Sequence, residues 1–459
     1  MQAQPAVRIV VGNWETLGVH ARGVREEVFV REQGIPADLE WDASDPSSVH
    51  CVAYAGDTPV GTGRLLPDAH IGRMAVLAAH RNAGVGALML ARLVEEAHSR
   101  GDAEVLLSSQ ASAVRFYERH GFEAEGPPHV EVGIPHQRMR RVLRDGGFGR
   151  VRATEQRRVM PDGTELLVRD WTPRWPNGRG VYLLHGLGEH IGRYDALANW
   201  FGERGWRVRG HDHVGHGRSA GKRGVIARPA QLDEHATHLL DQYADELGAA
   251  PLLLGHSMGG ALAAHLVACR GARVSALVLS SPALDPGLSG FQRLLLGVLE
   301  RIAPELAVGN GLDPQQLSHD ASVVKAYLED PLVHDRVSGR LLRWLVDAGE
   351  RSIAAAPALA VPTLLMVAGA DRLVRPEGSR RFAQRSSAGV LTMQWYESMH
   401  HELFNEQPQD RQRVLSDLER WLVILRRQEL ITATEHDALL KLAWNMNVNQ
   451  IRSLFSGKH

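Results

Sequence analysis

Short apolar runs recur through the second half of the chain, and a turn and then a helical segment follow most of them. The runs are GVYLLHG (180–186), WRVRGHD (206–212), PLLLGHS (251–257), SALVLSS (275–281), PTLLMVAG (362–369) and VLTMQWY (390–396). Strands that are buried on both faces of a sheet have this composition, and intervening helices favour parallel pairing. The pattern therefore predicts a mostly parallel sheet that is covered by helices.

One interval breaks this rhythm. From about Pro286 to Ile353 the pattern is helical and has no strand-like run, and a structureless loop of that length is uncommon in a compact domain. We expect a helical cap at about 286–353, inserted over the sheet. Its first helix carries apolar residues at helical spacing, which either line an acyl tunnel, touch a membrane surface or pack on their neighbours. They are Phe291, Leu294, Leu295, Val298, Leu299 and Ile302.

The first part of the chain has a mixed pattern. It predicts strands at 7–14, 70–77 and 104–110, a hairpin from 50–56 and 58–66, and helices at 16–33, 85–101 and 111–121. The glycine-rich stretch RDGGFGR (144–150) then reads as a linker. We expect an N-terminal domain at 1–145, a second domain at 151–426 and a helical tail at 427–459, where Thr432 and Glu435 form a capping box.

Composition narrows the functional classes. The chain has 459 residues with a net charge of −1, which argues against a basic surface that binds nucleic acid. Cys51 and Cys269 are its two cysteines, so no disulfide framework is expected. No leader pattern and no uninterrupted run of about 18 apolar residues is present. We expect a cytoplasmic protein, and contact of the cap with the inner face of the membrane stays open.

The pentapeptide GHSMG places Ser257 between Gly255 and Gly259, after an apolar run and before an alanine-rich helix. A serine hydroxyl becomes a nucleophile only beside a base that an acid orients. Asp371 follows a later strand, and His400 and His401 follow the next one, so the three residue types come in the order that this strand–turn–helix setting requires. Backbone N–H groups of Met258 and Leu187 are the expected donors to an oxyanion.

Longer stretches make the resemblance specific. HGLGEHIGRYDALANWF (185–201), GHDHVGHGRSAGKRG (210–224), DPLVHD (330–335) and HHELFNE (400–406) resemble the monoacylglycerol lipase and lysophospholipase branch of the α/β-hydrolases, close to the S33 serine aminopeptidases. The resemblance implies that Ser257 is the nucleophile, that Asp371 orients the base and that the base is the histidine before Glu402, which is His401. It also implies a lipid-like ester substrate, a monoacylglycerol or a lysolipid.

A histidine-rich loop suggests a different chemistry. HDHVGH contains His211, His213 and His216 with Asp212, at spacings that metal ligands also have. The same hexapeptide is a strand-end loop without a metal in the lipase-like pattern. We therefore expect no metal.

The N-terminal part carries a possible cofactor site. RNAGVG (81–86) has the R-x-x-G-x-G spacing between a strand and a helix start, where free N–H groups and the helix dipole favour anions. Together with AVRFYERHGF (113–122) and VREEVFVREQGIPADLEWD (24–42), it resembles the GNAT acetyltransferases. The resemblance implies that acetyl-CoA is a co-substrate and that Tyr117 donates a proton to the departing thiolate. The implied cofactor-binding residues are Met74, Val76, Arg81, Asn82, Ala83, Gly84, Val85, Gly86 and Ala87.

The acetyl acceptor is an amine that the sequence does not identify, and Glu40, Asp42 or a water molecule is its base. The sequence therefore predicts a bifunctional α/β enzyme, an N-acetyltransferase of mixed sheet joined to a serine ester hydrolase with a mostly parallel sheet. Two alternatives stay open. The first domain could sense acyl-CoA without catalysis, or the acyl-serine could transfer its acyl group to an alcohol other than water.

Overall fold

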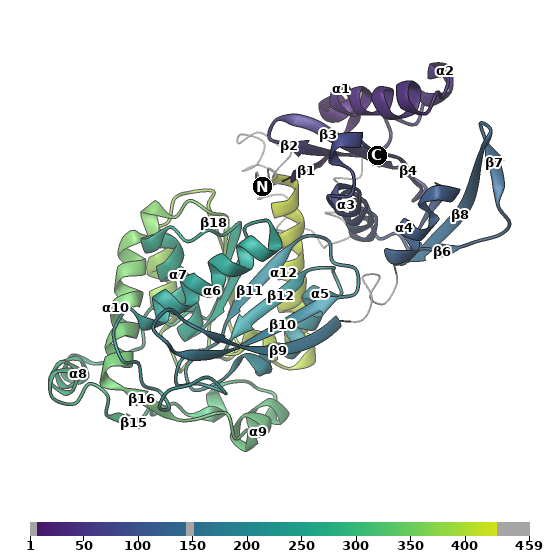
Figure 1. Cartoon of the computed structure of the whole chain (residues 1–459). Helices are drawn as coiled ribbons and strands as arrows, with labels where there is room; N and C mark the ends of the chain where they lie inside the picture. The colour runs from purple at the N-terminus through teal and green to yellow at the C-terminus, as the bar shows by residue number, and fades with distance from the viewer. Residues whose placement is uncertain (1–6, 144–150, 429–459) are drawn as a thin grey trace.

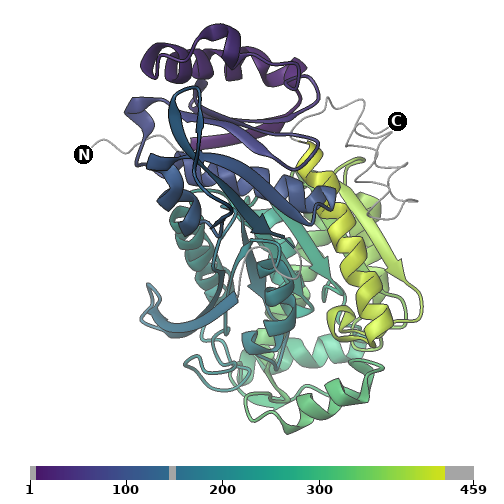
Figure 2. The same cartoon turned by 90° about the vertical axis from the view of Figure 1, so that its right-hand side faces the viewer.

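The computed structural model describes residues 7–143 and 151–428, which form two units with separate cores. We call residues 7–143 the N-terminal unit and residues 151–428 the C-terminal unit. In Figure 1 the first is purple to blue and the second teal to yellow, and both views place the N-terminal unit at the end of the molecule opposite the green cap helices. Figure 2 shows the same arrangement from the side. The expected tail at 427–459 and the linker lie almost entirely outside the described residues.

The N-terminal unit has a sheet split in two. β1 to β4 form an antiparallel sheet in sequence order, β5 and β6 pair with β8, and a bridge between His70 and Leu106 joins the two halves. The strands are β1 (Val7–Gly12), β2 (Val49–Ala55), β3 (Thr58–Leu65), β4 (Ile71–Val76), β5 (Glu104–Gln110), β6 (Glu123–Ala124), β7 (His129–Glu131) and β8 (Ile134–Val142). The mixed sheet and the hairpin from β2 to β3 agree with the sequence pattern, whereas β6, β7 and β8 were not predicted.

Helices cover both faces of this sheet. α1 (Trp14–Arg25) packs on one face, where Leu17 and Ala21 meet Val52 and Tyr54. α3 (Val85–Arg100) packs on the other face through its buried leucines and valines. The remaining helical segments are the π-helical η1 (Glu26–Glu32), α2 (Ala37–Glu40), η2 (Ala78–His80), η3 (Ala111–Ala113) and α4 (Val114–Arg119).

The C-terminal unit is built on an eight-stranded sheet with the order β18-β17-β14-β13-β11-β12-β10-β9. All neighbours pair in parallel except β12 with β10 and β10 with β9. The strands are β9 (Val151–Val159), β10 (Glu165–Pro173), β11 (Gly180–Leu184), β12 (Arg207–His211), β13 (Leu252–His256), β14 (Ala276–Ser280), β17 (Thr363–Ala368) and β18 (Leu391–Tyr396). The mostly parallel sheet confirms the predicted fold class.

Two apolar cores lie on the two faces of this sheet. One is covered by α6, α7, α10 and α11, and the other by α5 and α12. The helical segments are η4 (Ile191–Tyr194), α5 (Asp195–Gly202), α6 (Gln231–Leu247), α7 (Met258–Arg270), α10 (Gly339–Ala355), η6 (Ala356–Ala358), α11 (Pro376–Arg385), η7 (Leu403–Asn405) and α12 (Pro408–Gln428). All carboxyl ends of the parallel strands meet at one edge, where ligands of such sheets bind.

The interval that we assigned to a helical cap also contains strands, which corrects the prediction that it has none. β15 (Ala307–Gly309) and β16 (Arg336–Ser338) pair antiparallel, between α8 (Gly290–Ile302), η5 (Pro314–Gln316) and α9 (Ala321–Glu329). Strands of three residues are too short to show an alternating pattern. Helix α10 falls inside the assigned range, but its Leu341, Trp344 and Leu345 are buried in the core over the sheet.

The two units touch through the connection between β10 and β11. The Trp175 indole N–H donates to the carbonyl of Arg119 at 3.0 Å, and a Cβ on Gly121 would lie 2.7 Å from that ring. Arg179 pairs with Glu95 at 3.3 Å. These contacts join the C-terminal unit to α3 and to the end of α4. Among the residues that the structure describes, no helix has the length and apolar character of a membrane span.

Candidate functional site

Ser257 lies at a strained turn between β13 and α7. Its backbone has φ 52° and ψ −118°, a conformation that L-residues rarely adopt. The flanking glycines make this turn sterically feasible. A Cβ on Gly255 would lie 2.2 Å from the Gly259 carbonyl, and a Cβ on Gly259 would lie 2.2 Å from the Leu184 carbonyl. The turn exposes the serine at the carboxyl edge of the sheet, as a nucleophile requires.

His401 and Asp371 come from the loops that follow β18 and β17. The Nδ1 atom of His401 lies 2.6 Å from Oδ2 of Asp371, and both side chains are almost fully buried. The Oδ1 atom of Asp371 accepts the backbone N–H groups of Leu373 and Val374, which fixes the carboxylate. Burial alone would lower the pKa of His401, but the Asp371 carboxylate outweighs it and raises the pKa above its usual value. In turn His401 lowers the pKa of Asp371, against the effect of its burial.

Ser257 and His401 line the same cavity, which has a volume of about 290 Å³. His256, next to the serine, packs its ring against that of His401 with centroids 4.7 Å apart. The apolar part of the lining includes Leu187 and Leu373, and the cap contributes Leu312, Leu317, Leu328 and Val333. The polar part of the cap lining is Asn310, Asp313, Asp330, His334 and Asp335. The cavity thus combines an apolar wall with several hydrogen-bonding groups.

The predicted oxyanion donors lie beside the serine. A Cβ on Gly186 would lie 3.2 Å from the Cβ of Ser257, so the loop that carries Leu187 passes directly along it. Met258 is the first residue of α7, and N–H groups at this position of a helix have no partner within the helix. Backbone amides at both positions can therefore face a tetrahedral oxygen.

A buried ionic network holds these loops, and the sequence analysis did not assign it. Glu189 accepts the Gly186 amide at 2.6 Å and the Tyr194 hydroxyl at 2.7 Å. Arg193 bridges Glu189 and Glu402, with nitrogen–oxygen distances of 2.5 and 2.6 Å. Because Glu402 follows His401 in sequence, the network connects the loop of the predicted oxyanion donor Leu187 to the loop of His401. The only sequence signal was the spacing of these residues in GLGEHIGRY and HHEL.

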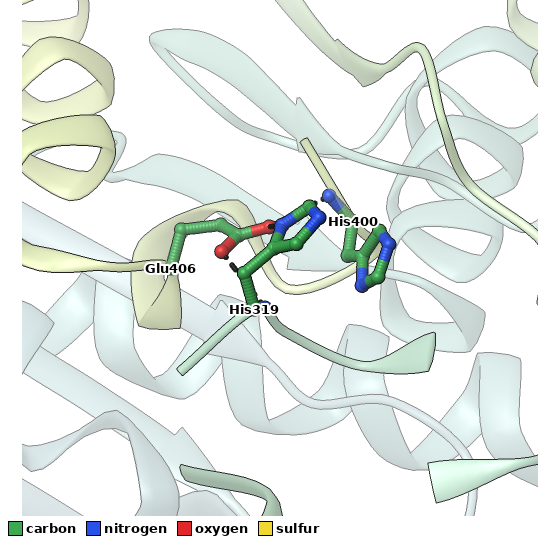
Figure 3. A group of neighbouring side chains, drawn as sticks. All are labelled: His319, His400 and Glu406. Carbon is green, nitrogen blue, oxygen red and sulfur yellow. Dashed lines mark hydrogen bonds and ion pairs between the residues drawn. The ribbon is translucent and has the colours of Figure 1, made fainter. Parts of the chain in front are cut away.

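His400, the other candidate base, contacts a different group. Its ring stacks on His319 with centroids 3.6 Å apart, and its backbone N–H donates to Glu406 at 2.7 Å (Figure 3). Asp371 bonds to His401 instead. This geometry favours His401 as the base.

Two further sequence-based hypotheses concern the cap helix and the HDHVGH loop. Val298 and Ile302 are exposed, at 49% and 79%, and neither lines the cavity. The side chains of Phe291, Leu294, Leu295 and Leu299 lie outside the described ones. The histidines of HDHVGH bond separately, His211 to the Tyr182 hydroxyl, His213 to the His185 carbonyl and His216 to the Val214 carbonyl. Each ring is thus held by its own partner.

The N-terminal unit presents the predicted cofactor site at the splayed edge of its sheet. β4 pairs with β3 on one side, while its contact with β5 in the described residues is the single bridge at His70. The backbone near Met74 and Val76 is therefore free of a neighbouring strand. Asn82 and Gly84 have φ 61° and 80°, and they lead into the amino end of α3 at Val85–Ala87.

Arg81 is engaged within this site. Its guanidinium pairs with both carboxylate oxygens of Glu32, at 2.7 and 2.6 Å, and its Nε donates to the Val76 carbonyl at 2.9 Å. The side chain therefore braces the loop between β4 and α3 and would have to leave Glu32 to contact a pyrophosphate. Ala83, Gly84 and Gly86 leave the amide surface of this loop uncovered by long side chains.

Tyr117 lies on α4, buried between Phe116 and Phe122. Burial raises the pKa of its hydroxyl to about 12, so it stays protonated at neutral pH. The hydroxyl therefore has a proton to donate, while the raised pKa makes it a weaker acid than an exposed tyrosine, so the shift itself does not favour the acid role.

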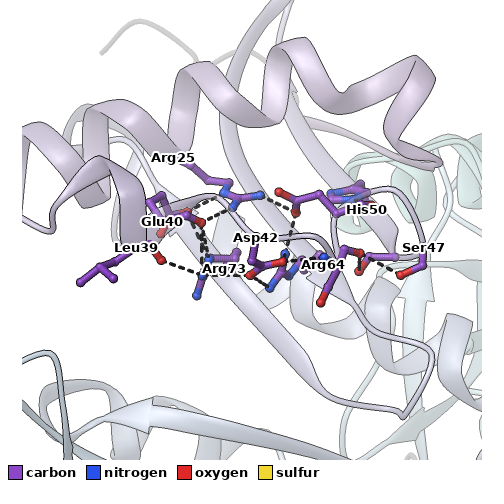
Figure 4. A network of polar contacts seen from close by, with 11 residues as sticks. Arg25, Leu39, Glu40, Asp42, Ser47, His50, Arg64 and Arg73 are labelled. Atoms are coloured by element: carbon purple, nitrogen blue, oxygen red, sulfur yellow. Dashed lines mark hydrogen bonds and ion pairs between the residues drawn. The ribbon is translucent and has the colours of Figure 1, made fainter.

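The two candidate bases belong to a network of guanidinium and carboxylate groups (Figure 4). Glu40 accepts from Arg25 at 2.6 Å, and Asp42 accepts from Arg64 at 2.6 Å and from Arg73 at 3.2 Å. The hydrogen bond from Arg64 lowers the pKa of Asp42, whereas burial raises that of Glu40. Ion pairing makes Asp42 a weaker base, so it does not favour this residue in that role.

Comparison with known proteins agrees with both units. The family model for serine aminopeptidase S33 matches residues 177–408, and the model for the GNAT acetyltransferase domain matches residues 19–143. A monoacylglycerol lipase of Mycolicibacterium smegmatis is 36% identical over 265 residues, which are 57% of this chain and 94% of that protein. An uncharacterised N-acetyltransferase of Bacillus subtilis is 41% identical over 120 residues, 25% of this chain and 86% of that protein.

A solved structure extends the comparison. The monoacylglycerol lipase of Paleococcus ferrophilus is 35% identical, aligns with a TM-score of 0.50 and covers 60% of this chain and 99% of its own. The chain belongs to the serine aminopeptidase S33 family of α/β-hydrolases and carries a GNAT acetyltransferase domain at its N-terminal end.

Proposed function

We propose that the chain is bifunctional, with a hydrolase of lipid carboxylic esters in the C-terminal unit and an acetyl-CoA-dependent N-acetyltransferase in the N-terminal unit. The hydrolase part of the proposal rests on the 2.6 Å contact between His401 and Asp371. His401 and the strained Ser257 also line one cavity. Nucleophile, base and orienting acid thus come from three loops at one edge of the sheet.

The reaction follows from these positions. The Ser257 oxygen attacks the ester carbonyl carbon while His401 accepts the serine proton, and Asp371 stabilises the imidazolium. The Leu187 and Met258 amides stabilise the oxyanion, an effect worth several kcal/mol in comparable sites. Collapse of the tetrahedral species releases the alcohol, which takes the proton from His401. Water then attacks the acyl-serine by the same route and releases the carboxylic acid.

The lining of the cavity supports a monoacylglycerol or a lysophospholipid as substrate. Leucines at 187, 312, 317, 328 and 373 offer an apolar wall for an acyl chain. The polar groups of Asn310, Asp313 and Asp335 offer hydrogen bonds to a hydroxylated head group. The names of the related lipases agree with this class.

The cap also supports peripheral contact with a lipid surface. Ile302, Leu306 and Val308 expose 79%, 54% and 43% of their surface, and all three lie on the cap stretch 302–308. Apolar side chains that are exposed together on one segment are typical of surfaces that meet a membrane. We propose that the cap carries this contact.

The second half of the proposal rests on the N-terminal unit. The free edge of β4 and the amino end of α3 suit acetyl-CoA, whose pyrophosphate would lie on residues 82–87. There the amine nitrogen attacks the carbonyl carbon of the thioester, the carbon–sulfur bond breaks, and the hydroxyl of Tyr117 protonates the departing thiolate. The nitrogen gives its proton to Glu40 or a water molecule, and solvent returns a proton to Tyr117.

A fluorophosphonate probe tests the hydrolase. The probe reacts with activated serines, so it should label the peptide that contains Ser257 in the full chain and should leave Ser257→Ala unlabelled. Hydrolysis of monoacylglycerols and lysophospholipids should be lost in the same variant. Labelling of any other peptide would remove Ser257 from its assigned role.

Tyr117→Phe tests the transferase. Acetyl transfer to a panel of amines should fall by at least tenfold, whereas acetyl-CoA binding and ester hydrolysis should persist. Phenylalanine preserves the ring packing against Phe116 and Phe122 and removes the hydroxyl alone. Unchanged transfer by the variant would contradict the acid role.

A further inference from the structure

Three side chains from separate segments meet beside the catalytic loop, and the proposed hydrolysis uses none of them. His319 lies in the cap between η5 and α9, His400 directly precedes His401, and Glu406 lies between η7 and α12. One potential ligand atom from each side chain lies within 4.8 Å of the other two. Within residues 7–143 and 151–428 this is the one group of three or more histidine, cysteine or acidic side chains with such spacing.

Glu406 is already organised for a ligand role. Its side chain is fully buried, and it accepts the backbone amides of His319 at 3.0 Å and His400 at 2.7 Å. These bonds hold the carboxylate beside the His319 ring, and the His400 ring lies on the other side of that ring (Figure 3). The Oε1 atom of Glu406 also lies 2.9 Å from Nδ1 of His319, and a metal ion can replace the proton that these two atoms share.

His400 supplies an unsatisfied group. Its Nδ1 atom is buried and has no hydrogen-bond partner among the described residues. One ring nitrogen is likewise open in His211, His213, His216, His235 and His265. His400 differs from these because its ligand atom lies near those of His319 and Glu406. The ring is held against His319 by stacking at 3.6 Å, and the ligands of a tetrahedral zinc ion lie about 3.3 Å apart. The ligand atoms of the three side chains now lie within 4.8 Å of one another, so the two stacked rings have to turn out of their stack for both to face one ion.

We propose that His319, His400 and Glu406 bind a divalent transition-metal ion of the Zn²⁺ type. Two imidazoles and one carboxylate form a ligand set that zinc accepts, whereas Ca²⁺ and Mg²⁺ prefer oxygen ligands alone. The side chain of His319 is 41% exposed, so an ion can reach the site from solvent. Three protein ligands leave the fourth position to water, which makes the ion exchangeable.

Such an ion would join the cap to the loop of the base. His319 follows Leu317 in the cap, and Leu317 lines the substrate cavity. His400 directly precedes His401 in the sequence. Hydrogen bonds from the Glu402 amide to the Leu317 carbonyl and from the Ser318 hydroxyl to the Asn405 carbonyl already connect the cap to this loop. The bound metal would strengthen that connection and slow the entry of a bulky ester. The ion therefore acts as a reversible inhibitor of the proposed hydrolase, while its binding does not depend on that function.

Zinc binding to the full chain without an affinity tag tests the site directly. We expect one Zn²⁺ per chain by calorimetry after treatment with a chelator, and a tetrahedral Co²⁺ spectrum when Co²⁺ replaces it. His319→Gln and His400→Gln should each weaken binding by at least tenfold. His129→Gln is the matched control, because it removes a histidine that pairs with Glu131 but belongs to no cluster of three.

Two results would overturn the proposal. The first is a wild-type chain without stoichiometric binding, and the second is affinity that neither His319→Gln nor His400→Gln changes. The Co²⁺ spectrum of the wild type reports the nitrogen ligands without the use of any variant. The test therefore remains valid even if a variant folds poorly.

Measurements of the hydrolysis rate test the proposed inhibition by the metal ion. Hydrolysis of a monoacylglycerol should fall as Zn²⁺ occupies the site and should return with a chelator. Each variant is compared with its own metal-free rate, and His319→Gln should lose its response to Zn²⁺ at concentrations that saturate the wild type. A wild-type rate that stays constant at full occupancy would refute the inhibitory role, even if the ion binds.

Discussion

Ser257 shows how one residue joins reactivity to local strain. Its φ of 52° and ψ of −118° are tolerated because Gly255 and Gly259 let three backbone segments come close together. Conformations of this kind cost about 1–3 kcal/mol for a residue with a side chain. The strain therefore lowers the stability of the fold at the position of the proposed nucleophile.

Ser257→Gly should be more stable than Ser257→Ala, although both variants should be inactive as hydrolases. Glycine adopts the strained conformation readily, and alanine keeps the strain. The free energy of unfolding in urea should differ by about 1 kcal/mol in favour of glycine, after part of the gain is lost to its larger freedom in the unfolded chain. Equal unfolding free energies would show that the turn is not strained.

Asp371→Asn should reduce kcat for ester hydrolysis by about a thousandfold or more, because an amide cannot stabilise the imidazolium and favours the wrong tautomer of His401. Steady-state kinetics with a short, water-soluble ester measure this change. Glu397→Gln is the control, since Glu397 is an exposed carboxylate at the same edge of the sheet that bonds to Trp395. Wild-type activity in Asp371→Asn would mean that another group orients the base.

At the scale of elements, Asp233 joins three helices. It lies on α6, accepts the Trp344 indole N–H of α10 at 3.1 Å and lies 3.5 Å from Nε2 of His265 on α7. It also pairs with Arg270 at 3.0 Å. Hydrogen bonding to Asp233, and then to Cys269, raises the pKa of His265 to about 9.

The raised pKa predicts a pH-dependent contribution to stability. A histidine with a folded pKa near 9 and an ordinary unfolded pKa near 6.5 stabilises the fold fully below pH 6.5, and this contribution disappears as the pH rises through 9. The difference in unfolding free energy between the wild type and His265→Gln should therefore be larger at pH 6 than at pH 9.5. Urea unfolding at both values measures it, and an equal difference at both would contradict the prediction.

Strands that are buried on both faces could be predicted from the sequence, and the exposed edge strand β9 could not. β11, β13, β14 and β17 have every residue buried, so their apolar runs stand out. β9 is exposed along nearly its whole length, and its sequence VRATEQRRV has no apolar alternation. Pairing with β10 alone makes it a strand.

The residues of the candidate sites also differ in whether the sequence could predict them. Ser257, Asp371 and His401 follow apolar strands in a recognisable order, so the sequence suggested them without coordinates. In the group of His319, His400 and Glu406, a cap residue lies beside two residues that come more than eighty positions later in the sequence. No local sequence spacing could have predicted this group. Contacts that depend on how an insertion folds back over the sheet need the three-dimensional structure.

At the scale of the whole molecule, Trp175 is the main anchor between the units. It donates to Arg119, contacts Gly121 closely and lies 4.9 Å from the Arg141 guanidinium. Trp175→Ala should remove about 2 kcal/mol of coupling between the units, because a large aromatic surface becomes solvated. Calorimetry should then resolve two unfolding transitions that lie further apart than in the wild type. Trp395→Ala, a change of the same size at the far edge of the second sheet, should not separate them.

The position of this anchor has a thermodynamic consequence. Leu88 and Glu95 of α3 face Gly178 and Arg179, and the end of α4 supports Trp175. The same two helices carry the proposed acetyl-CoA site, so bound acetyl-CoA is expected to stabilise the helices against which the C-terminal unit packs. The temperature at which esterase activity is lost is then expected to rise with the logarithm of the free acetyl-CoA concentration. The thermal stability of the proposed hydrolase would thus report how much acetyl-CoA is available to the proposed transferase.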